Sequence, residues 1–355
     1  MKKIVSFFLF TVFAVTALAQ FPEVSIAGSQ LRTIQSTIVN QEYELHILLP
    51  GGYEKSTKKY PVVYLMDSQW DFPLLKSLYG QHYYDGFIPE LIVVGVTWGG
   101  ADPKPDSLRA RDYTPTNEKR MIQSGGADKF LSFMKAELFP FIETNYKADP
   151  ANRTLMGCSL GGLITLYALF TQPELFTGYA AASPAIGWDR EVLYKYEKDF
   201  YQKKLLKPVR LFMTIGDLER SRPAYEKFAA QMMSRNYSSV SMQSKILENT
   251  GHSGTKSETF GRGLQYIFEK AKLAVNADLL TKYASVYESE TGNKLIIKKE
   301  NNSLVLYVSP TNKYLLYAAT ESEFYATAEF LNIYFTDDGM RLERYSSSQF
   351  FKKVK

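Results

Sequence analysis

Cysteine and histidine are the scarcest reactive residues in this chain of 355 residues. Cys158 is the single cysteine, so no intramolecular disulfide can form and the core alone must stabilise the fold. The formal net charge is only +5, without a dense block of Lys and Arg, which gives no case for nucleic-acid binding. The sequence also lacks a metal-ligand cluster, a phosphate-binding loop and a dinucleotide fingerprint, so we expect no metal and no cofactor.

The N-terminus carries a targeting pattern. Met1-Lys2-Lys3 precedes an apolar run over residues 4–18, and the small residues around Ala19 fit a cleavage site after that residue. This pattern predicts a signal peptide over residues 1–19 and therefore export, either to the periplasm or out of the cell. An uncleaved anchor is the alternative, but the run is short for a membrane span, so we expect no stable membrane insertion after cleavage.

Apolar residues are plentiful enough to fill a large core. A hydrophobic content of 45%, with an aromatic share of 14%, argues against disorder. Strand and helix patterns alternate from residue 60 to 273, which predicts a mostly parallel sheet with helices on both faces, a three-layer α/β sandwich. Beyond Asn276 short strands separated by turn residues predict a small antiparallel β domain over 276–355, leaving 20–275 for the α/β domain.

Buried apolar runs and amphipathic patterns place the individual elements. They predict a first hairpin and then further strands, at 33–38, 43–48, 60–66, 91–96, 153–158, 178–182, 209–215 and 241–247. Helical patterns follow several of these strands, at about 74–79, 128–141, 163–170, 223–234 and 258–273. Residues 97–126 are predicted to form one long loop, and loops of this length in compact domains are usually functional.

The stretch Gly157-Cys158-Ser159-Leu160-Gly161 lies between a buried strand pattern and a helical pattern. Gly-x-Ser-x-Gly in this setting is typical of a nucleophile elbow, a strained turn that lifts the serine hydroxyl above the sheet. Gly157 and Gly161 carry no side chain that would make the strand and the helix collide. We therefore predict that Ser159 is a nucleophile, whereas Cys158 is expected to point into the sheet.

The position of His252 favours it over the other two histidines as a general base. It follows the predicted strand 241–247, lies between glycines, and comes after the nucleophile in the chain order serine, acid, histidine. His46 lies inside a strand that precedes the nucleophile, and His82 lies among residues of surface or packing type. His252 is therefore the predicted base toward Ser159 and the later acid toward the leaving group.

The acidic partner is expected just after the strand at 209–215, where Asp217 and Glu219 both qualify. Glu219 is the first choice because it can turn back under the imidazole. Asp217 is the second choice, because its carboxylate could simply shape the turn. The role of the acid is to hold the histidine tautomer and offset the imidazolium charge.

Backbone N–H groups and a substrate pocket complete the predicted site. Leu160 follows the nucleophile and supplies one oxyanion donor, and the loop after strand 60–66 supplies the other, from Gln69 or Ser68. The loop at 97–126 with Arg109 and Arg111, together with the tryptophans Trp70, Trp98 and Trp188, predicts a polar or aromatic acyl group rather than a long lipid. The candidate substrate contacts are Arg111, Trp188 and Trp70. Arg111 either pairs with an anionic substrate group or forms a structural ion pair with Asp112 or another carboxylate, and both interpretations stay open.

Several motifs, in this order, resemble a known family. They are Tyr64-Leu65-Met66-Asp67-Ser68-Gln69, Arg111-Asp112-Tyr113-Thr114-Pro115-Thr116, Glu137-Leu138-Phe139-Pro140-Phe141-Ile142, the elbow, Ala182-Ser183-Pro184 and Gly216-Asp217-Leu218-Glu219. The set spans about residues 30–272 and resembles the Putative esterase family of α/β-hydrolases. That family includes trilactone siderophore esterases, esterase D, feruloyl and acetyl-xylan esterases and mycobacterial mycolyltransferases.

The resemblance implies an α/β-hydrolase fold and assigns roles to matching positions. Ser159, Glu219 and His252 would be the triad, and Gln69 and Leu160 the oxyanion donors. Two positions depart from the family pattern, because Cys158 stands where histidine is frequent and Ser68 where glycine is usual. The residues after 276 also resemble a small β domain that is appended to some hydrolases.

These observations predict an exported serine esterase that acts through an acyl-enzyme on a siderophore lactone or an acylated saccharide. An acyltransferase on the same scaffold is one alternative, and a non-catalytic binding protein is another. The expected partner is therefore a small-molecule or saccharide ester. The sequence gives no indication of the oligomeric state.

Overall fold

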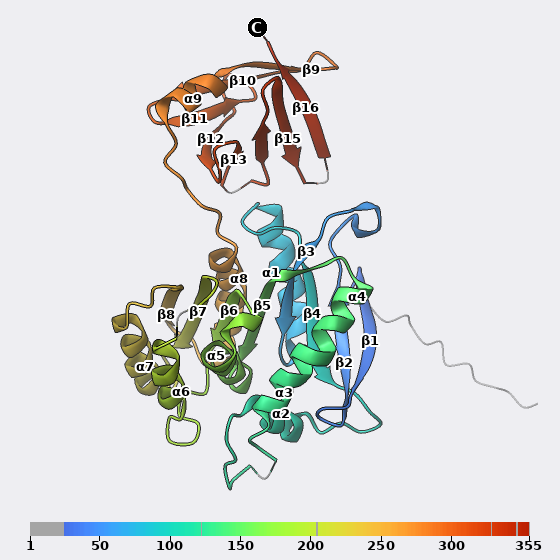
Figure 1. Ribbon diagram of the computed structural model, residues 1–355, viewed down its shortest axis with the longest axis vertical. Helices are drawn as coiled ribbons and strands as arrows, with labels where there is room; N and C mark the ends of the chain where they lie inside the picture. Colours follow the sequence, from blue (N-terminus) through green and yellow to red (C-terminus); the bar gives the residue numbers. More distant parts are fainter. Residues whose placement is uncertain (1–24, 122, 204, 328, 346, 355) are drawn as a thin grey trace, which may run out of the picture.

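The computed structural model describes residues 25–121, 123–203, 205–327, 329–345 and 347–354. The predicted signal peptide at 1–19 lies outside these described residues. The described part of the chain forms an α/β unit followed by a β-barrel (Figure 1). Within it, no helix combines the length and the apolar character that crossing a membrane would need.

An eight-stranded sheet forms the centre of the α/β unit, in the order β1-β2-β4-β3-β5-β6-β7-β8. Only β2 runs antiparallel to the other strands, since it pairs antiparallel with β1 and β4 while all remaining pairs are parallel. The prediction of a mostly parallel sheet behind an N-terminal hairpin is therefore confirmed. The strands are β1 (Ser29–Ser36), β2 (Gln41–Leu48), β3 (Tyr60–Leu65), β4 (Ile92–Trp98), β5 (Ala148–Cys158), β6 (Gly178–Ala182), β7 (Val209–Gly216) and β8 (Val240–Leu247).

Helices cover both faces of this sheet, which gives the predicted three layers. One face carries α1 (Ser68–Tyr84) and α8 (Thr255–Ile267). The other face carries α2 (Pro105–Tyr113), α3 (Ala127–Phe133), α4 (Phe139–Asn145), α5 (Leu160–Thr171), α6 (Leu193–Tyr201) and α7 (Arg222–Ser234). A π-helical turn, η2 (Met134–Leu138), joins α3 to α4 just before Pro140, and the short helices η1 (Tyr53–Lys55), η3 (Pro173–Leu175) and η4 (His252–Gly254) lie in connections.

Two sequence-based assignments near the site are wrong. Residues 97–126 are not one long loop, because β4 extends to Trp98 and α2 occupies Pro105–Tyr113. Pro105 looks like a loop residue, but at the first helical position it costs no hydrogen bond and has the φ that a helix needs. The helix expected at about 74–79 begins six residues earlier, at Ser68, so the predicted oxyanion loop is the first turn of α1.

The C-terminal residues form a closed antiparallel barrel in the order β10-β11-β12-β13-β14-β15-β16-β9, preceded by helix α9 (Ala277–Tyr283). This confirms the predicted antiparallel β domain, while its exact limits at 275 and 276 stay a prediction. The strands are β9 (Ser285–Ser289), β10 (Lys294–Glu300), β11 (Ser303–Tyr307), β12 (Lys313–Ala318), β13 (Glu323–Tyr325), β14 (Asn332–Phe335), β15 (Gly339–Arg344) and β16 (Ser347–Lys353). Inward side chains such as Leu304, Ile333 and Met340 form its own core.

The barrel packs against the C-terminal end of α1 (Figure 1). Tyr83 contacts Phe330 with ring centroids 5.1 Å apart, and Tyr84 stacks on Tyr345 at 5.0 Å. Because α1 runs antiparallel to β3, this contact lies at the end of the sheet where β3 begins. The opposite end, where the parallel strands finish, is the end that carries the predicted site residues.

Candidate active site

The predicted site residues gather at the carboxyl ends of the parallel strands. Ser159 follows β5, Glu219 follows β7, and His252 begins η4 after β8. Ser68 and Gln69 form the first turn of α1, directly after β3. Since β3, β5, β6, β7 and β8 are parallel, these loops all lie at one edge of the sheet, where α/β proteins place their ligands.

Ser159 has the backbone strain that an elbow requires, with φ 60° and ψ −116° at the start of α5. The crossing of β5 and α5 is tight, because a Cβ on Gly157 would lie 2.7 Å from the carbonyl carbon of Gly161. Cys158 is buried in the sheet, and burial raises the pKa of its thiol to about 12. The cysteine therefore stays a neutral thiol at physiological pH, and the hydroxyl of Ser159 is the group raised at the turn.

His252 is hydrogen-bonded to Glu219, with 2.6 Å between Nδ1 and Oε2. Asp217 is engaged elsewhere, because its Oδ1 accepts the N–H of Thr250 at 3.0 Å and so shapes the turn. Glu219 only accepts when ionised, so Nδ1 of His252 carries the proton and Nε2 is left as the base. The structure thus brings Glu219 and His252 together, and it does not bring Asp217 to the imidazole.

The surroundings of Glu219 favour its ionised form. Its side chain is 5% exposed, and burial alone would raise the pKa of this carboxyl. Hydrogen bonds from Ser183, His252 and the N–H of Gly216 outweigh the burial, so the pKa lies below its ordinary value. A carboxylate held in this state can offset the charge that the imidazole gains during proton transfer.

Ser183 is a residue of this site to which the sequence analysis gave no role. Its hydroxyl lies 2.6 Å from Oε1 of Glu219 and 2.8 Å from Oγ1 of Thr255. Ser183 is buried and has a φ of 40°, an unusual value for a residue with a side chain. The motif Ala182-Ser183-Pro184 was the available signal, but nothing in the sequence connects it to an acid that comes 36 residues later.

Two helix N-termini meet beside the nucleophile and offer backbone donors. A Cβ on Gly161 would lie 3.2 Å from Oδ2 of Asp67, so the starts of α5 and α1 are neighbours. In α1, the N–H groups of Trp70 and Asp71 donate to the carbonyl of Asp67, at 3.0 and 3.2 Å. Within the described residues, the N–H groups of Ser68, Gln69 and Leu160 have no backbone acceptor. These three include both predicted oxyanion donors, and each has a free N–H for a developing negative charge.

A buried ion pair fixes the turn that carries the α1 donors. Nε and Nη2 of Arg109 donate to the two carboxylate oxygens of Asp67, at 3.0 and 2.8 Å. Burial raises the pKa of Asp67, and this effect is larger than the lowering of the pKa by Arg109. Asp67 itself has a φ of 56°, so the bidentate pair holds a strained residue at the start of α1.

The three residues predicted to contact substrate differ in what they do. Arg111 is bound to Asp112, with Nε and Oδ1 2.6 Å apart, which favours the second alternative, a structural ion pair. The Asp112 carboxylate also accepts from Tyr43 and Trp98, so Arg111 balances a buried network rather than facing a ligand. Trp70 is 50% exposed and lies next to the α1 donors, while Trp188 is half-buried and donates to Thr116 at 3.1 Å.

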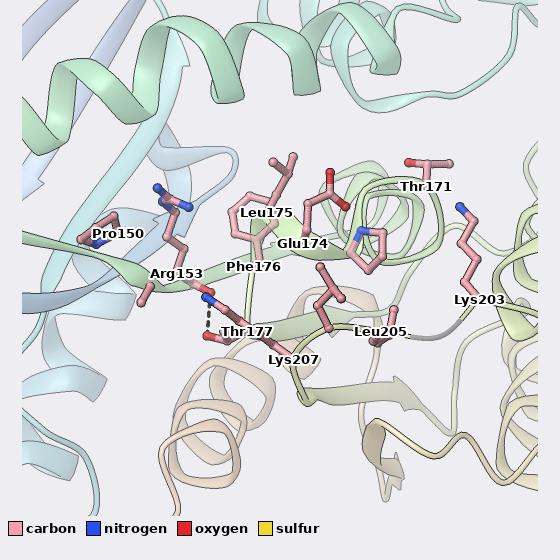
Figure 2. Close-up of a pocket in the computed structure, with 13 residues that line it drawn as sticks. Pro150, Arg153, Thr171, Glu174, Leu175, Phe176, Thr177, Lys203, Leu205 and Lys207 are labelled. Atoms are coloured by element: carbon pink, nitrogen blue, oxygen red, sulfur yellow. Dashed lines mark hydrogen bonds between the residues drawn. The ribbon is translucent and has the colours of Figure 1, made fainter.

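A cavity of about 610 Å³ lies at the other end of the sheet, away from these residues (Figure 2). Its lining comes from the start of β5, from η3 and from the segment before β7, and it includes Arg153, Leu175 and Lys207. None of the predicted site residues contributes to it. Among the described residues this cavity is therefore separate from the elbow.

Comparison with known proteins identifies the family. The family model described as "Putative esterase" matches residues 36–293. The chain belongs to this family. Proteins similar to it are named esterases and serine hydrolases, and the protein is a carboxylic ester hydrolase.

Three similar proteins illustrate the relationship. The esterase is 30% identical over 229 residues to the ferri-bacillibactin esterase BesA of Bacillus subtilis, which covers 58% of this chain and 78% of that protein. The structure of the BES protein from Bacillus cereus is 26% identical with a TM-score of 0.64, over 70% of this chain and 97% of that chain. An IroE-like serine hydrolase from Shewanella oneidensis is also 26% identical, with a TM-score of 0.61 over 72% and 83% of the two chains.

Proposed function

We propose that this esterase uses Ser159, His252 and Glu219 as a catalytic triad and cleaves its ester through an acyl-enzyme. The observation that carries the proposal is the hydrogen bond of 2.6 Å between His252 and the buried Glu219, at the same sheet edge as the strained Ser159. A nucleophile, an acid and a base in this chain order and on these loops are the parts that acyl transfer needs.

The proposed reaction moves one proton in each half. Nε2 of His252 takes the hydroxyl proton of Ser159 while Oγ forms a bond to the ester carbonyl carbon. The tetrahedral oxyanion accepts hydrogen bonds from Leu160 and Gln69. His252 then gives the proton to the leaving alcohol as the carbon–oxygen bond breaks. Water repeats the sequence on the acyl-enzyme and releases the acid.

For the substrate, we propose a siderophore ester with an aromatic acyl group. The similarity to a ferri-bacillibactin esterase supports this class. The exposed face of Trp70, which lies 5.6 Å from the guanidinium of Arg109, offers a stacking surface beside the donors. An acylated saccharide is the second class, and transfer to an alcohol in place of water is the alternative reaction.

Export is also proposed, on the pattern at residues 1–19. A processed chain would begin at Gln20, and N-terminal sequencing of the protein recovered from the periplasm or medium checks this. A full-length N-terminus on the exported protein would contradict cleavage.

Replacing the nucleophile tests the mechanism. Ser159→Ala is expected to abolish hydrolysis of an activated short-chain ester and labelling by a fluorophosphonate probe, with an unchanged circular dichroism spectrum. Ser107→Ala is the matched control, because Ser107 is exposed on α2, and it should keep both properties. Hydrolysis by Ser159→Ala at the parent rate would exclude Ser159 as the nucleophile.

A substrate panel tests the specificity. Ferri-bacillibactin and a feruloylated or acetylated xylan oligosaccharide are compared by kcat/KM on the same preparation. A higher value for the siderophore supports the first class, and a higher value for the saccharide replaces it with the second. Adding an alcohol acceptor and measuring the transferred product distinguishes an acyltransferase from a hydrolase.

A further inference from the structure

A second hydrogen-bonded chain of serine, histidine and glutamate lies beside the site. Oγ of Ser68 is 2.8 Å from Nδ1 of His46, and Nε2 of His46 is 3.0 Å from Oε1 of Glu44. His46 and Glu44 are on β2, whereas Ser68 is the first residue of α1. The chain therefore runs from the half-exposed Glu44 to the helix turn that carries the oxyanion donors.

The sheet leaves a space for the side chain of Ser68. His46 pairs with Gly95 across β2 and β4, and a Cβ on Gly95 would lie only 2.0 Å from Oγ of Ser68. Ser68 is 1% exposed, so its hydroxyl is enclosed between the backbone of β4 and the imidazole. A buried hydroxyl needs a partner, and His46 is the partner that this space provides.

The hydrogen atoms in this chain have one arrangement when the imidazole is neutral. The carboxylate of Glu44 only accepts, so Nε2 of His46 carries the proton. Nδ1 is then an acceptor, and the hydroxyl of Ser68 donates to it. The two ring nitrogens therefore have opposite roles in the two histidines, because in His252 it is Nδ1 that faces the carboxylate. Ser68 is also enclosed, so the hydrogen-bonded series Ser68, His46 and Glu44 cannot act as a second nucleophilic triad.

We propose that His46 is a positioning residue for the oxyanion donors. By fixing Ser68 it fixes the first turn of α1, and with it the N–H groups of Ser68 and Gln69. This inference rests on the proposed function, because it concerns the same oxyanion. It assigns a role to a histidine that does not contact the reacting atoms.

The other contacts of this turn show why a further anchor is needed. Asp67 at the N-cap makes no side-chain capping bond, because its carboxylate is held by Arg109. Within the described residues, the buried amide of Gln69 makes no hydrogen bond. Arg109 therefore holds the residue before the donors, and His46 holds the first residue of the helix. Backbone donors stabilise the oxyanion only when they point at the place where it forms, so the first turn of α1 must be held in position.

Removing the hydrogen bond tests the role. His46→Phe keeps a ring against Phe72 but has no nitrogen, and kcat is expected to fall about tenfold with KM changed by less than about twofold. This loss is smaller than that for deleting an oxyanion donor, which costs about a hundredfold or more. His46→Asn keeps an acceptor near the position of Nδ1 and should recover part of the kcat.

Ser68→Ala removes the same bond from its other end and should lower kcat by a similar factor. The double variant His46→Phe/Ser68→Ala is expected to fall no further than either single variant, because one bond is lost in all three. His82→Phe is the matched control, since His82 bonds to Gln265 on α8 and should leave kcat unchanged. Thermal unfolding followed by circular dichroism checks that each variant is folded.

Parent-like kcat in folded His46→Phe and Ser68→Ala would overturn the proposal, and so would additive losses in the double variant. If His46→Phe does not fold, Ser68→Ala alone decides, because it removes only a hydroxyl. The proposed function has its own readout in Ser159→Ala. An inactive Ser159→Ala together with fully active His46 and Ser68 variants would leave the esterase mechanism standing and remove only the positioning role.

Discussion

At the scale of single residues, the site separates two carboxylates that lie two positions apart in the chain. Asp217 accepts a hydrogen bond from the N–H of Thr250, and this bond is the main reason that the pKa of Asp217 lies below its ordinary value. Glu219 reaches the imidazole, and its second oxygen is held by Ser183 and Gly216. One carboxylate therefore maintains a turn while the other is available to the base. Because the two carboxylates have different partners, neutralising each one is expected to lower kcat to a different extent.

Glu219→Gln is expected to lower kcat on an activated ester on the order of ten-thousandfold, as the loss of a triad carboxylate does elsewhere. The amide cannot balance the imidazolium charge, and it can favour the wrong tautomer of His252. Asp217→Asn keeps an oxygen that can accept from Thr250, so its kcat should stay within about threefold of the parent. Steady-state rates at one pH near neutrality measure both. A larger loss in Asp217→Asn than in Glu219→Gln would reverse the assignment.

At the scale of elements, the sequence predicted the strands best. Runs such as Val62–Leu65 and Ile92–Val96 are apolar on both faces, and their short length and β-branched residues favour a strand buried on both sides over a buried helix. The elbow was also accessible, because two glycines and a serine have fixed spacing between a strand and a helix. Helices were predicted less well, since the start of α1 and the whole of α2 lie in polar sequence with proline.

The contacts that support the site could not be predicted from the sequence, for a physical reason. Ser183 meets Glu219, and His46 meets Ser68, only after the sheet has brought distant segments together. Nothing in the local pattern marks these residues, because a buried serine or a strand histidine is usually structural. The role of Arg111 stayed open for a different reason, because a sequence alone does not show whether an arginine faces a substrate or pairs with a neighbouring carboxylate such as Asp112.

The crossing of β5 and α5 makes a prediction at this scale. Gly157→Ala would place a Cβ 2.7 Å from the carbonyl carbon and oxygen of Gly161, and these backbone atoms cannot rotate away. The strand and helix must then separate, at a cost of about 1–3 kcal/mol in the free energy of unfolding, with a lower kcat because Ser159 moves. Gly187→Ala is the control, because nothing lies within 4 Å of its added Cβ. Urea unfolding measures both, and equal stability of the two variants would show that the crossing can relax.

At the scale of the whole molecule, the barrel and the site occupy opposite ends of the sheet (Figure 1). Contacts between the two units are made by the end of α1 and by the connection after α8. Nζ of Lys270, for example, lies 3.5 Å from Oε1 of Glu323, and the N–H of Leu273 donates to Ala318 at 2.9 Å. Within the described residues, the barrel contributes no side chain to the site that we describe. Changes in the docking of the barrel should therefore leave the chemistry intact.

Gly86 gives a way to separate docking from catalysis. It follows α1 with a φ of 73°, and an added Cβ would lie 2.3 Å from the carbonyl oxygen of Glu329 on the barrel. Gly86→Ala is therefore expected to loosen the contact and to speed proteolysis of the connection at 268–276, while kcat on a small activated ester stays unchanged.

Gly52→Ala is the matched control for this variant, because Gly52 has a φ of 71° and open space around its added Cβ. It carries the same backbone strain without the collision, so any difference between the two variants comes from the barrel contact. Limited proteolysis and steady-state rates are measured on both. Equal proteolysis would mean that the Gly86 contact does not hold the barrel. A loss of kcat in Gly86→Ala alone would contradict the independence of docking and chemistry. It would show that α1, which reaches from the barrel contact to the site, transmits the displacement to the oxyanion donors in its first turn.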